Sequence, residues 1–592
     1  MRRWMAIGTA VLLSVWGRPG MGGTLRMERL EADLKAGKLS EETVLLYKAY
    51  SVLAPERVPS IYRTDGFNKC GTGTLLEVLG KWNTLGSRAK SALSPLLRRP
   101  VLSYSYPSES GRFRIHYDME GGDAVDRTDK DGDGVPDIVE LAAAYFDSAY
   151  VLEVEELGYR EPVPDDEGGD EAWDVYMREL STQRVYGYTT PGHRVGRSYS
   201  YTSFVEIDNG FTEEHVYPTV REDALKITAA HEFFHVIQFS YYGLSGMEWW
   251  MEMTATWMED VAYDEVNDYY NYLGSPFNTP FTHPEQALDR RDNQHEYGAS
   301  VFAHYLSERF GRDVIRSIWE NVASTGQADM RPLDRMIPGG LKAALPEFYV
   351  WNYFTGKRAR PDVYYEEGAY YPQVHMQHRH RGYPAEGEGS VEHLGATYIQ
   401  FEVPPDRAVG GLSVQFDEED VEAWEERLIK VTRAQNVEIE ALSGGRGEVA
   451  DWSYYEDLVL VGVVTAPSGY RFPYRYVGEQ DTSFAKPPPD VASLDAPYPN
   501  PFLVRDGDRM RRVTIPFGLS KTAEVVVSVH TVEGALVWRV RLGALGPRYY
   551  EDLVRWDGRN ERGVVVGSGM YVVQMNAGGF RAQRIVVVVR EK

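Results

Sequence analysis

The sequence predicts a multidomain protein in which an α+β domain is followed by two all-β sandwich (Ig-like) domains. Its 592 residues exceed what one hydrophobic core usually organises, so several domains are expected. Apolar residues recur at helical spacing through much of the chain up to about residue 370, whereas strand-like alternation dominates beyond residue 385. Two polar or proline-rich stretches interrupt the pattern and are typical of linkers.

The expected domain order follows these changes of pattern. A signal peptide (residues 1–22) precedes a helical N-terminal segment (23–108) that we expect to be a propeptide; the α+β domain (109–385), a β-sandwich (386–485) and an Ig-like sandwich (486–592) follow. The signal peptide is predicted from two arginines, an apolar run too short to span a bilayer and small residues suited to cleavage. No later stretch is typical of a transmembrane helix, so we expect export without a transmembrane anchor.

Composition disfavours several classes of function. The formal net charge of −25 argues against binding to nucleic acid or to anionic membrane surfaces. With 43% hydrophobic and 26% charged residues, the chain is typical of a globular protein. Cys70 is the only cysteine, so an intrachain disulfide is excluded and stability must come from packed cores and bound ions.

Periodicity predicts the elements of the α+β part. Alternation over residues 201–210 predicts a half-buried strand. Apolar residues at helical spacing predict amphipathic helices at residues 27–53, 138–157, 223–242, 249–272 and 297–311.

The first linker is expected at residues 374–390. It contains His375, His378 and His380, which could bind a metal ion, but the arginines that alternate with them would repel a cation. We therefore interpret this stretch as a solvated linker. The second linker is the proline cluster at residues 485–502.

The most specific motif is HExxH, formed by His231, Glu232 and His235. Residues four apart lie on one face of a helix, so both imidazoles can reach one ion while Glu232 lies beside it. Zinc suits two neutral imidazoles and a carboxylate, with a fourth position open for water. A pair of buried histidines without a metal is the alternative, and a third ligand would decide between the two.

Carboxylates on the following predicted helix can supply that ligand. Glu248, Glu252 and Glu259 have the spacing i, i+4 and i+11, so all three can share one helix face. Three tryptophans surround them, which indicates burial, and an unpaired buried charge would be costly.

HExxH followed by Glu252 and Ala255, an ExxA pattern, resembles the gluzincin metallopeptidases. The resemblance implies a zincin-like domain with Glu252 as the third zinc ligand and Glu259 orienting a histidine. The interval from His235 to Glu252 is shorter than in the best-known gluzincins, which keeps Glu259 open as the alternative ligand. Tyr297, followed by a Gly-Ala pair, is similar to a downstream gluzincin tyrosine and is implied as a transition-state donor.

The chemistry implied by this resemblance is peptide hydrolysis. Zinc lowers the pKa of bound water, Glu232 takes its proton, and the hydroxide attacks a carbonyl that the metal polarises. Zincins hold an extended substrate along an edge strand, which residues 201–208 are expected to provide. Residues 111–371 also resemble exported bacterial metalloproteases that combine HExxH with an aspartate-rich loop and residues like "EMTATWMED".

The aspartate-rich loop matches the EF-hand calcium template over residues 129–140. So many carboxylates in one loop would repel each other without a cation, and a helix is expected to follow. We therefore expect a structural calcium site. Its ligands by position are Asp129, Asp131, Asp133, Val135 through its carbonyl, Asp137 and Glu140.

Cys70 lies beside Lys69, which would favour the thiolate. Our hypothesis is that this thiolate occupies the open zinc position until the N-terminal segment is removed, in a way that resembles the cysteine switch of other zinc proteases. An inert, half-buried cysteine is the alternative.

The C-terminal stretches "APYPNPF", "VEGALVW", "RWDGRNERG" and "SGMYVV" resemble the sorting domain of proteins exported by the bacterial type IX system. The resemblance implies the type IX machinery as a partner and a secreted or cell-surface location. A plain Ig-like adhesion module is the alternative.

Together these features predict a secreted zinc-dependent peptidase that acts on proteins or peptides. The alternative is a catalytically inactive, zincin-like cell-surface binding or adhesion protein. Glu232 favours the enzyme, because a site without turnover needs no general base.

Overall fold

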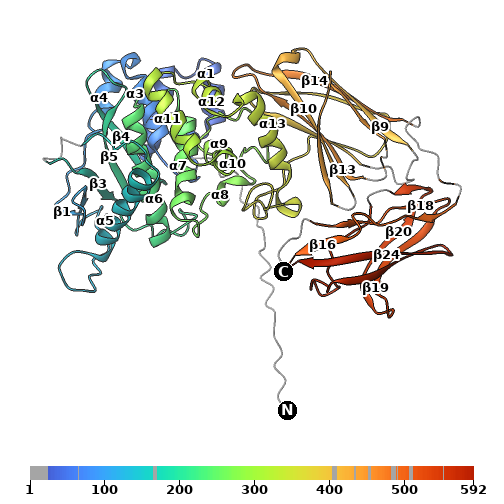
Figure 1. Ribbon diagram of the computed structural model, residues 1–592. Helices are drawn as coiled ribbons and strands as arrows, with labels where there is room; N and C mark the ends of the chain where they lie inside the picture. The colour runs from blue at the N-terminus through green and yellow to red at the C-terminus, as the bar shows by residue number, and fades with distance from the viewer. Residues whose placement is uncertain are drawn as a thin grey trace. The chain divides into compact units, whose positions relative to one another are not determined.

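The computed structural model describes residues 25–64, 66–164, 170–402, 410–432, 435–450, 452, 455–481, 489, 491–505, 511–550 and 553–591. The expected signal peptide lies outside these residues. The chain divides into two compact units, one with the residues up to Ala344 together with Trp351–Val374, and the other with Leu345–Val350 and the residues from His375 onward (Figure 1). The α/β part and the β-rich part of the expected multidomain order are both present.

Four helices form the N-terminal part of the first unit: α1 (Met27–Lys35), α2 (Glu41–Leu53), α3 (Thr72–Gly80) and α4 (Ser87–Leu93). Ser40 begins α2 by accepting a hydrogen bond from Thr43 N–H, a usual N-cap arrangement. Leucines and tyrosines of these helices share a core with the loops between them. Short 3₁₀ turns lie at Pro55–Arg57, Ser60–Tyr62 and Trp82–Thr84.

A five-stranded mixed sheet carries the rest of the unit, in the order β1-β2-β3-β5-β4. Strands β2, β3 and β5 run parallel, and β4 lies antiparallel to β5 at the edge. The expectation that residues 201–208 form the edge strand is wrong, because they form β5, between β3 and β4. The strands are β1 (Tyr104–Pro107), β2 (Phe113–Tyr117), β3 (Trp173–Arg178), β4 (Gly187–Arg194) and β5 (Tyr201–Asp208).

Three helices pack on this sheet or beside it. Helix α5 (Asp137–Tyr150) continues into a π-helical turn at Val151–Glu156, and α6 (Arg221–Tyr241) packs against β4, β5 and α5. Helix α7 (Glu248–Ala262) packs on α6, so α6 is buried on nearly all sides. The helix expected at residues 249–272 ends ten residues early, at Ala262. The chain turns there, with Asn267 at a φ of 51°, a left-handed conformation that asparagine tolerates.

Shorter helices complete the unit. The helix expected to begin at residue 297 is divided in two, with a break around Ala299 and Ser300. Gly326, at a φ of 66°, ends α11 in the left-handed conformation typical of helix C-termini. The helices are α8 (Tyr270–Leu273), α9 (His295–Gly298), α10 (Val301–Phe310), α11 (Asp313–Thr325), α12 (Arg331–Met336), α13 (Gly340–Tyr353, shared with the second unit) and a 3₁₀ turn at Gly356–Arg358.

The second unit begins with two packed sheets, of orders β11-β10-β13-β8-β6 and β12-β9-β14-β7. The linker expected at residues 374–390 is wrong, because this stretch contains two strands, and His378 and His380 hydrogen-bond to tyrosine hydroxyls of β14. The strands are β6 (His378–His380), β7 (Ala385–Val391), β8 (Ala396–Phe401), β9 (Gly411–Glu418), β10 (Trp424–Thr432), β11 (Val437–Ala441), β12 (Arg446–Val449), β13 (Tyr455–Val464) and β14 (Phe472–Asp481), with a 3₁₀ turn at Val421–Ala423.

A further set of strands follows, with a five-stranded sheet of order β16-β24-β23-β19-β20 and two smaller sheets. Trp556 is fully buried in its core. The strands are β15 (Ser493–Leu494), β16 (Phe502–Arg505), β17 (Val513–Thr514), β18 (Phe517–Leu519), β19 (Ala523–Thr531), β20 (Leu536–Leu545), β21 (Arg548–Tyr550), β22 (Arg555–Trp556), β23 (Gly569–Ala577) and β24 (Phe580–Glu591).

Within the described ranges, none of the helices combines the length and the apolar character that crossing a membrane requires.

Candidate metal centre

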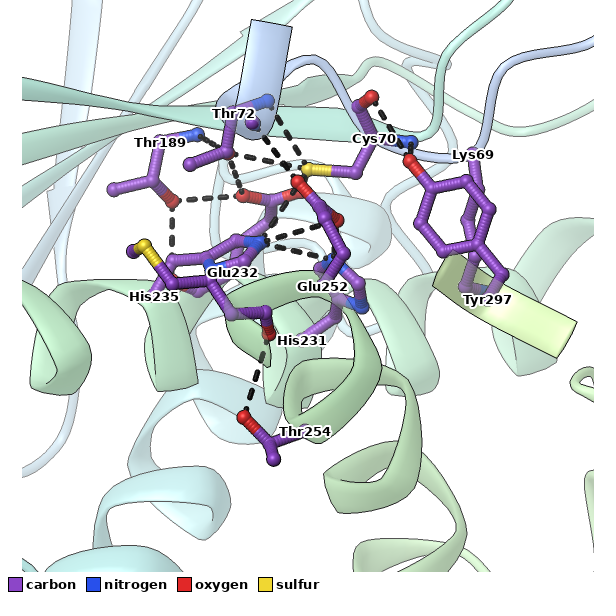
Figure 2. A network of polar contacts seen from close by, with 12 residues as sticks. Lys69, Cys70, Thr72, Thr189, His231, Glu232, His235, Glu252, Thr254 and Tyr297 are labelled. Atoms are coloured by element: carbon purple, nitrogen blue, oxygen red, sulfur yellow. Dashed lines mark hydrogen bonds and ion pairs between the residues drawn. The ribbon is translucent and has the colours of Figure 1, made fainter. Parts of the chain in front are cut away.

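Two histidines of α6 turn one nitrogen each toward the same point. His231 and His235 are one helical turn apart, and their Nε2 atoms lie 3.1 Å from each other (Figure 2). Each ring is held from its other side: His231 Nδ1 lies 2.6 Å from Glu259 Oε1, and His235 Nδ1 lies 2.7 Å from Gln238 Oε1. Both histidines are buried, so these contacts determine the orientation of the rings.

The Nδ1 partners determine which ring nitrogen carries hydrogen. Gln238 donates its amide hydrogens to Met251 O and Thr254 Oγ1, each at 3.0 Å, so its Oε1 can only accept from His235. The Glu259 carboxylate is likewise an acceptor. Neutral rings therefore carry hydrogen at Nδ1 and present bare lone pairs at Nε2. Two such lone pairs 3.1 Å apart repel each other unless a proton or a metal ion joins them.

Helix α7 adds a carboxylate to the same point. Glu252 Oε2 lies 3.4 Å from His231 Nε2 and 3.6 Å from His235 Nε2. Its Oε1 accepts a hydrogen bond of 2.8 Å from Gly73 N–H. A Cβ atom at residue 73 would lie 3.0 Å from that oxygen, so glycine permits the approach. Glu252 thus faces the Nε2 atoms, whereas Glu259 contacts His231 at Nδ1.

The fourth side chain is Cys70, on the loop before α3. Its Sγ lies 3.5 Å from His235 Nε2 and 3.4 Å from Glu232 Oε1. One ligand atom each from Cys70, His231, His235 and Glu252 lie within 4.8 Å of one another, and all four side chains are buried. Imidazole nitrogen, carboxylate oxygen and sulfur are the ligand types that zinc takes in proteins, commonly four at a time.

The electrostatics of this group favour a positive charge at its centre. Burial lowers the pKa of His231, but hydrogen bonds to Glu252 and Glu259 outweigh it, and the pKa rises to about 9. Burial raises the pKa of Glu252, yet the neighbouring histidines hold it far below its ordinary value. Burial and the nearby carboxylates raise the pKa of the Cys70 thiol. A divalent cation would satisfy all four ligand atoms together, so the residues fit a zinc ion.

Glu232 lies beside this group and faces the edge strand. Its Oε2 accepts a hydrogen bond of 2.7 Å from Thr189 Oγ1 on β4. A Cβ atom at Gly187 would lie 3.1 Å from Glu232 Oε1 and 2.8 Å from the Glu206 carbonyl oxygen, so glycine lets the strand and the carboxylate approach. Burial raises the pKa of Glu232 against the lowering effect of the two histidines, which favours uptake of a proton.

Residues 68–73, here named the Cys70 segment, extend the sheet at β4. Three backbone hydrogen bonds of 2.9, 3.0 and 3.2 Å join residues 68–71 to residues 184–187, and Cys70 pairs with Gly187 in a parallel bridge. The segment therefore occupies the sheet edge next to the metal centre, where a peptide could bind by strand addition.

Tyr297, expected as a transition-state donor, contacts the backbone of this segment. Its hydroxyl donates to the Cys70 carbonyl and accepts from the Cys70 N–H, each at 3.2 Å. Burial raises the pKa of Tyr297 well above its ordinary value, so the hydroxyl stays protonated and able to donate.

The expectation that Lys69 favours a Cys70 thiolate is wrong. The Lys69 ammonium points away from the sulfur, pairs with Asp268 and lies 2.9 Å from Glu259 Oε2. Burial lowers the pKa of Lys69, but these two carboxylates outweigh it and raise the pKa. The Lys69 ammonium therefore lies in an acidic pocket formed by Asp268 and Glu259, and Glu259 also contacts His231.

The predicted calcium loop has part of its expected geometry. The structure groups the carboxylates of Asp129, Asp131 and Asp133 within 4.8 Å of one another. Asp137 instead accepts from Lys130 N–H and lies 2.7 Å from Lys130 Nζ. The other two expected ligands, Val135 and Glu140, also lie near the loop aspartates. Val135 donates its N–H to Asp133, and burial together with the loop aspartates raises the pKa of Glu140.

Sequence reasoning missed several residues of the centre. Gln238 could have been found, because it lies at i+3 from His235 on the same helix face. Thr189, Gly187, Gly73 and Asp268 had no local signal, since each reaches the site from a distant part of the chain.

One family model matches the chain. It is described as a family of unknown function (DUF6055) and covers residues 204–337, which include the HExxH helix and α7. The search of curated proteins finds no match to this chain.

Similar solved structures superpose poorly. One is the type IX secretion component PorZ of Porphyromonas gingivalis, with 16% identity over 19% of this chain and 14% of that chain, at a TM-score of 0.13. Another is latent PorU of the same organism, with 13% identity over 37% of this chain and 19% of that chain, at a TM-score of 0.14. A β-glucuronidase of Parabacteroides merdae is also similar, with 11% identity over 35% of this chain and 28% of that chain, at a TM-score of 0.14. The chain spans less than a third of the length of each, and at these TM-scores the likenesses carry no argument about this chain.

Proposed function

We propose that this protein is a zinc-dependent peptidase that the Cys70 segment holds in a latent form. The observation that carries the proposal is the convergence of the Nε2 atoms of His231 and His235, Glu252 Oε2 and Cys70 Sγ on one buried point. These are the ligand types that zinc takes in proteins, and a cation would join all four atoms at once. His231, His235 and Glu252 would hold the zinc ion; the position of Glu252 Oε2 near both Nε2 atoms favours Glu252 over Glu259, which contacts His231 at Nδ1.

Zinc bound there would supply Lewis acidity toward a carbonyl oxygen and toward a water molecule. Glu232 lies beside the proposed ligands, where a general base is needed, and burial raises its pKa, which favours uptake of a proton. Its Oε1 lies 3.4 Å from Cys70 Sγ, so it faces the fourth ligand position. The Tyr297 hydroxyl can donate a hydrogen bond to a carbonyl oxygen there, as it now does to Cys70 O.

The proposed latent form is explained by three groups that the Cys70 segment blocks. The sulfur would take the fourth ligand position of a bound zinc ion, the segment backbone occupies the β4 edge, and Tyr297 binds the segment's own peptide group. Cys70 and Glu232 are 2% and 1% exposed, so no substrate carbonyl reaches Glu232 while the segment remains. Removal of the segment would open all three sites together.

The second candidate is a catalytically inactive, zincin-like surface binding protein. The packing of the N-terminal part favours it: Val52 and Leu75 share a buried cluster with Leu180, Val185 and Tyr188 of the main domain. A segment anchored in this way could close the site permanently, and four protein ligands are typical of structural zinc sites.

Metal analysis and a casein assay separate the two. The full chain should contain one zinc per molecule, and limited proteolysis within residues 63–108 should release caseinolytic activity that a chelator abolishes. Glu232→Gln should keep the zinc and lose the activity by about 10²-fold or more. Zinc binding with equal, background casein signals in both proteins would favour the binding protein, and absence of zinc would end both proposals.

Two further features belong to the proposal. The loop containing Asp129, Asp131 and Asp133 would bind a structural calcium ion. The C-terminal motifs and the β-strands that carry them support export through the type IX machinery, followed by release or retention at the cell surface. Deletion of residues 486–592 should then leave the protein inside a type IX-competent host, which cell fractionation would detect.

A further inference from the structure

Lys69 fills a pocket that the proposed chemistry does not use. The residue is 2% exposed, and its ammonium pairs with Asp268 and lies 2.9 Å from Glu259 Oε2. The rings of Tyr186 and Tyr272 lie 5.1 and 5.0 Å from the ammonium, as cation–π contacts do. The name Lys69 pocket is used here for Tyr186, Glu259, Asp268 and Tyr272.

The acids of this pocket are held in place by groups other than the lysine. Asp268 Oδ1 accepts hydrogen bonds from Tyr186, Thr219 and Asn271, at 3.2, 2.5 and 3.3 Å. This leaves its Oδ2 for the ammonium. Glu259 uses Oε1 for a histidine of the metal centre, which leaves Oε2. Two fixed carboxylate oxygens therefore converge where one ammonium group fits.

The residues that enter the pocket and the metal centre, Lys69 and Cys70, are neighbours in the segment that lies along the β4 edge. Tyr186 N–H donates to the Lys69 carbonyl at 3.0 Å, and the next residue, Cys70, has its side chain at the metal centre. A peptide that replaced the Cys70 segment on β4 along the same path would direct one side chain toward the metal and its neighbour into the pocket.

The negative charge of the empty pocket would attract a replacement cation. With Lys69 in place, the side chains of Glu259 and Asp268 are 2% and 0% exposed. If the Cys70 segment leaves, both carboxylates lose the ammonium between them. Two carboxylate oxygens held close together attract a cation, so a ligand that restores a positive charge gains affinity there. A neutral or acidic side chain gains nothing and leaves the pocket unpaired.

We infer that the Lys69 pocket is a specificity site for a lysine side chain of a peptide substrate bound along β4. The inference rests on the proposed peptidase function and names its substrate class. A cavity of about 10 Å³ beside Lys69, lined in part by Ile227 and Thr228, has room for little more than one water molecule. Lysine therefore fits the pocket, whereas the larger guanidinium of arginine is crowded.

The first experiment tests the pocket without any catalysis. Lys69→Ala in the full chain removes the ammonium and leaves both carboxylates. n-Propylammonium should raise the melting temperature of this variant by about 3 °C or more, and n-propanol, its neutral counterpart, should not. Lys48→Ala is the matched control, since Lys48 pairs with Glu77 at a partly exposed position, and should show no such difference.

The second experiment measures substrate choice by the full-length protein after limited proteolysis. Fluorogenic peptides that differ at one position, with lysine, arginine, norleucine or glutamate, are compared by kcat/KM. Lysine should exceed norleucine by about tenfold or more, with arginine between them. Asp268→Asn should reduce the ratio of lysine to norleucine toward one.

The outcomes distinguish this inference from the proposed function. Cleavage without preference for lysine overturns the inference and leaves the peptidase proposal standing. An ammonium effect without cleavage of any peptide supports the pocket as a site for basic side chains and removes the peptidase proposal. If Lys69→Ala folds and n-propylammonium does not raise its melting temperature, the inference is overturned. If this variant does not fold, the peptide assay decides, and cleavage without a preference for lysine overturns the inference.

Discussion

The Nε2 atoms of His231 and His235 lie 3.1 Å apart, and Glu259 and Gln238 bind the opposite nitrogens of the two rings. This pairing directs both Nε2 atoms toward one point, where either a proton or a metal ion must lie between them. This orientation of the two rings is the one that a shared metal ion would require.

The two acids of α7 should affect zinc to different degrees. Glu252→Ala removes an oxygen that faces both Nε2 atoms, so stoichiometric zinc should be lost. Glu259→Gln loosens only the orientation of His231 and should lower zinc affinity by about 10- to 100-fold. Competition with a chromophoric chelator measures both, with the exposed Glu265→Gln as the control. A larger loss in Glu259→Gln would identify that residue as the ligand instead.

Cys70 should bond to the metal in the full-length protein. Replacement of zinc by Co²⁺ should produce a sulfur-to-cobalt charge-transfer absorption that is absent from Cys70→Ser. The same substitution should raise the activity of the uncleaved chain, since serine is a weaker zinc ligand. Identical spectra in both proteins would show that the thiol is not a ligand and would leave the backbone of the segment as the only block.

Calcium should stabilise the loop between β2 and α5. At about 100 times its dissociation constant, a calcium ion contributes about 2.7 kcal/mol to the free energy of unfolding of the unit that binds it. The melting temperature should therefore fall on addition of a calcium chelator, and Asp131→Asn should remove most of this response. Glu120→Gln, an exposed acid outside the carboxylate group, is the control. A chelator response that persists in Asp131→Asn would refute calcium binding at this loop.

Glu426 in β10 should make the second unit less stable as pH rises. Burial, together with Glu418 and Glu425, raises the pKa of Glu426 to about 7, against the opposing effect of Arg427. Between its unfolded pKa of about 4.3 and 7, the folded state binds more protons, so the free energy of unfolding falls as pH increases.

Glu426→Gln removes this pH dependence. The variant should gain about 1 to 3 kcal/mol relative to the parent between pH 4.5 and pH 8. Guanidinium unfolding followed by tryptophan fluorescence at both pH values measures the difference. Glu422→Gln, an exposed acid before the same strand, should show no such gain, and an equal gain in both would assign the effect to net charge.

Local patterns explain most of what could be predicted. The HExxH histidines lie on one helix face because helical geometry depends only on spacing along the chain, and α6 follows the expected helix closely. The alternating stretches beyond residue 385 form β-sheets for the same reason. The aspartate loop is also local, and its first three carboxylates converge.

The errors came from contacts between distant parts of the chain. Residues 201–208 have the same alternation in an edge or an interior strand, so only the pairing of β5 with both β3 and β4 places them inside the sheet. Lys69 and Cys70 are neighbours in sequence, yet the lysine pairs with Asp268, 199 residues away. Charge patterns along the chain do not reveal such partners.

The sequence alone therefore determined that His231, Glu232 and His235 lie together on one helix, and that an α/β part is followed by β-sheets, because these features depend on short-range spacing. Only the tertiary structure decided that Glu252 rather than Glu259 faces the Nε2 atoms, that Cys70 completes the group, and that Lys69 enters an acidic pocket. These are long-range choices among chemically equivalent side chains, and they are made by the packing of α3, β4, α6 and α7 around one buried point.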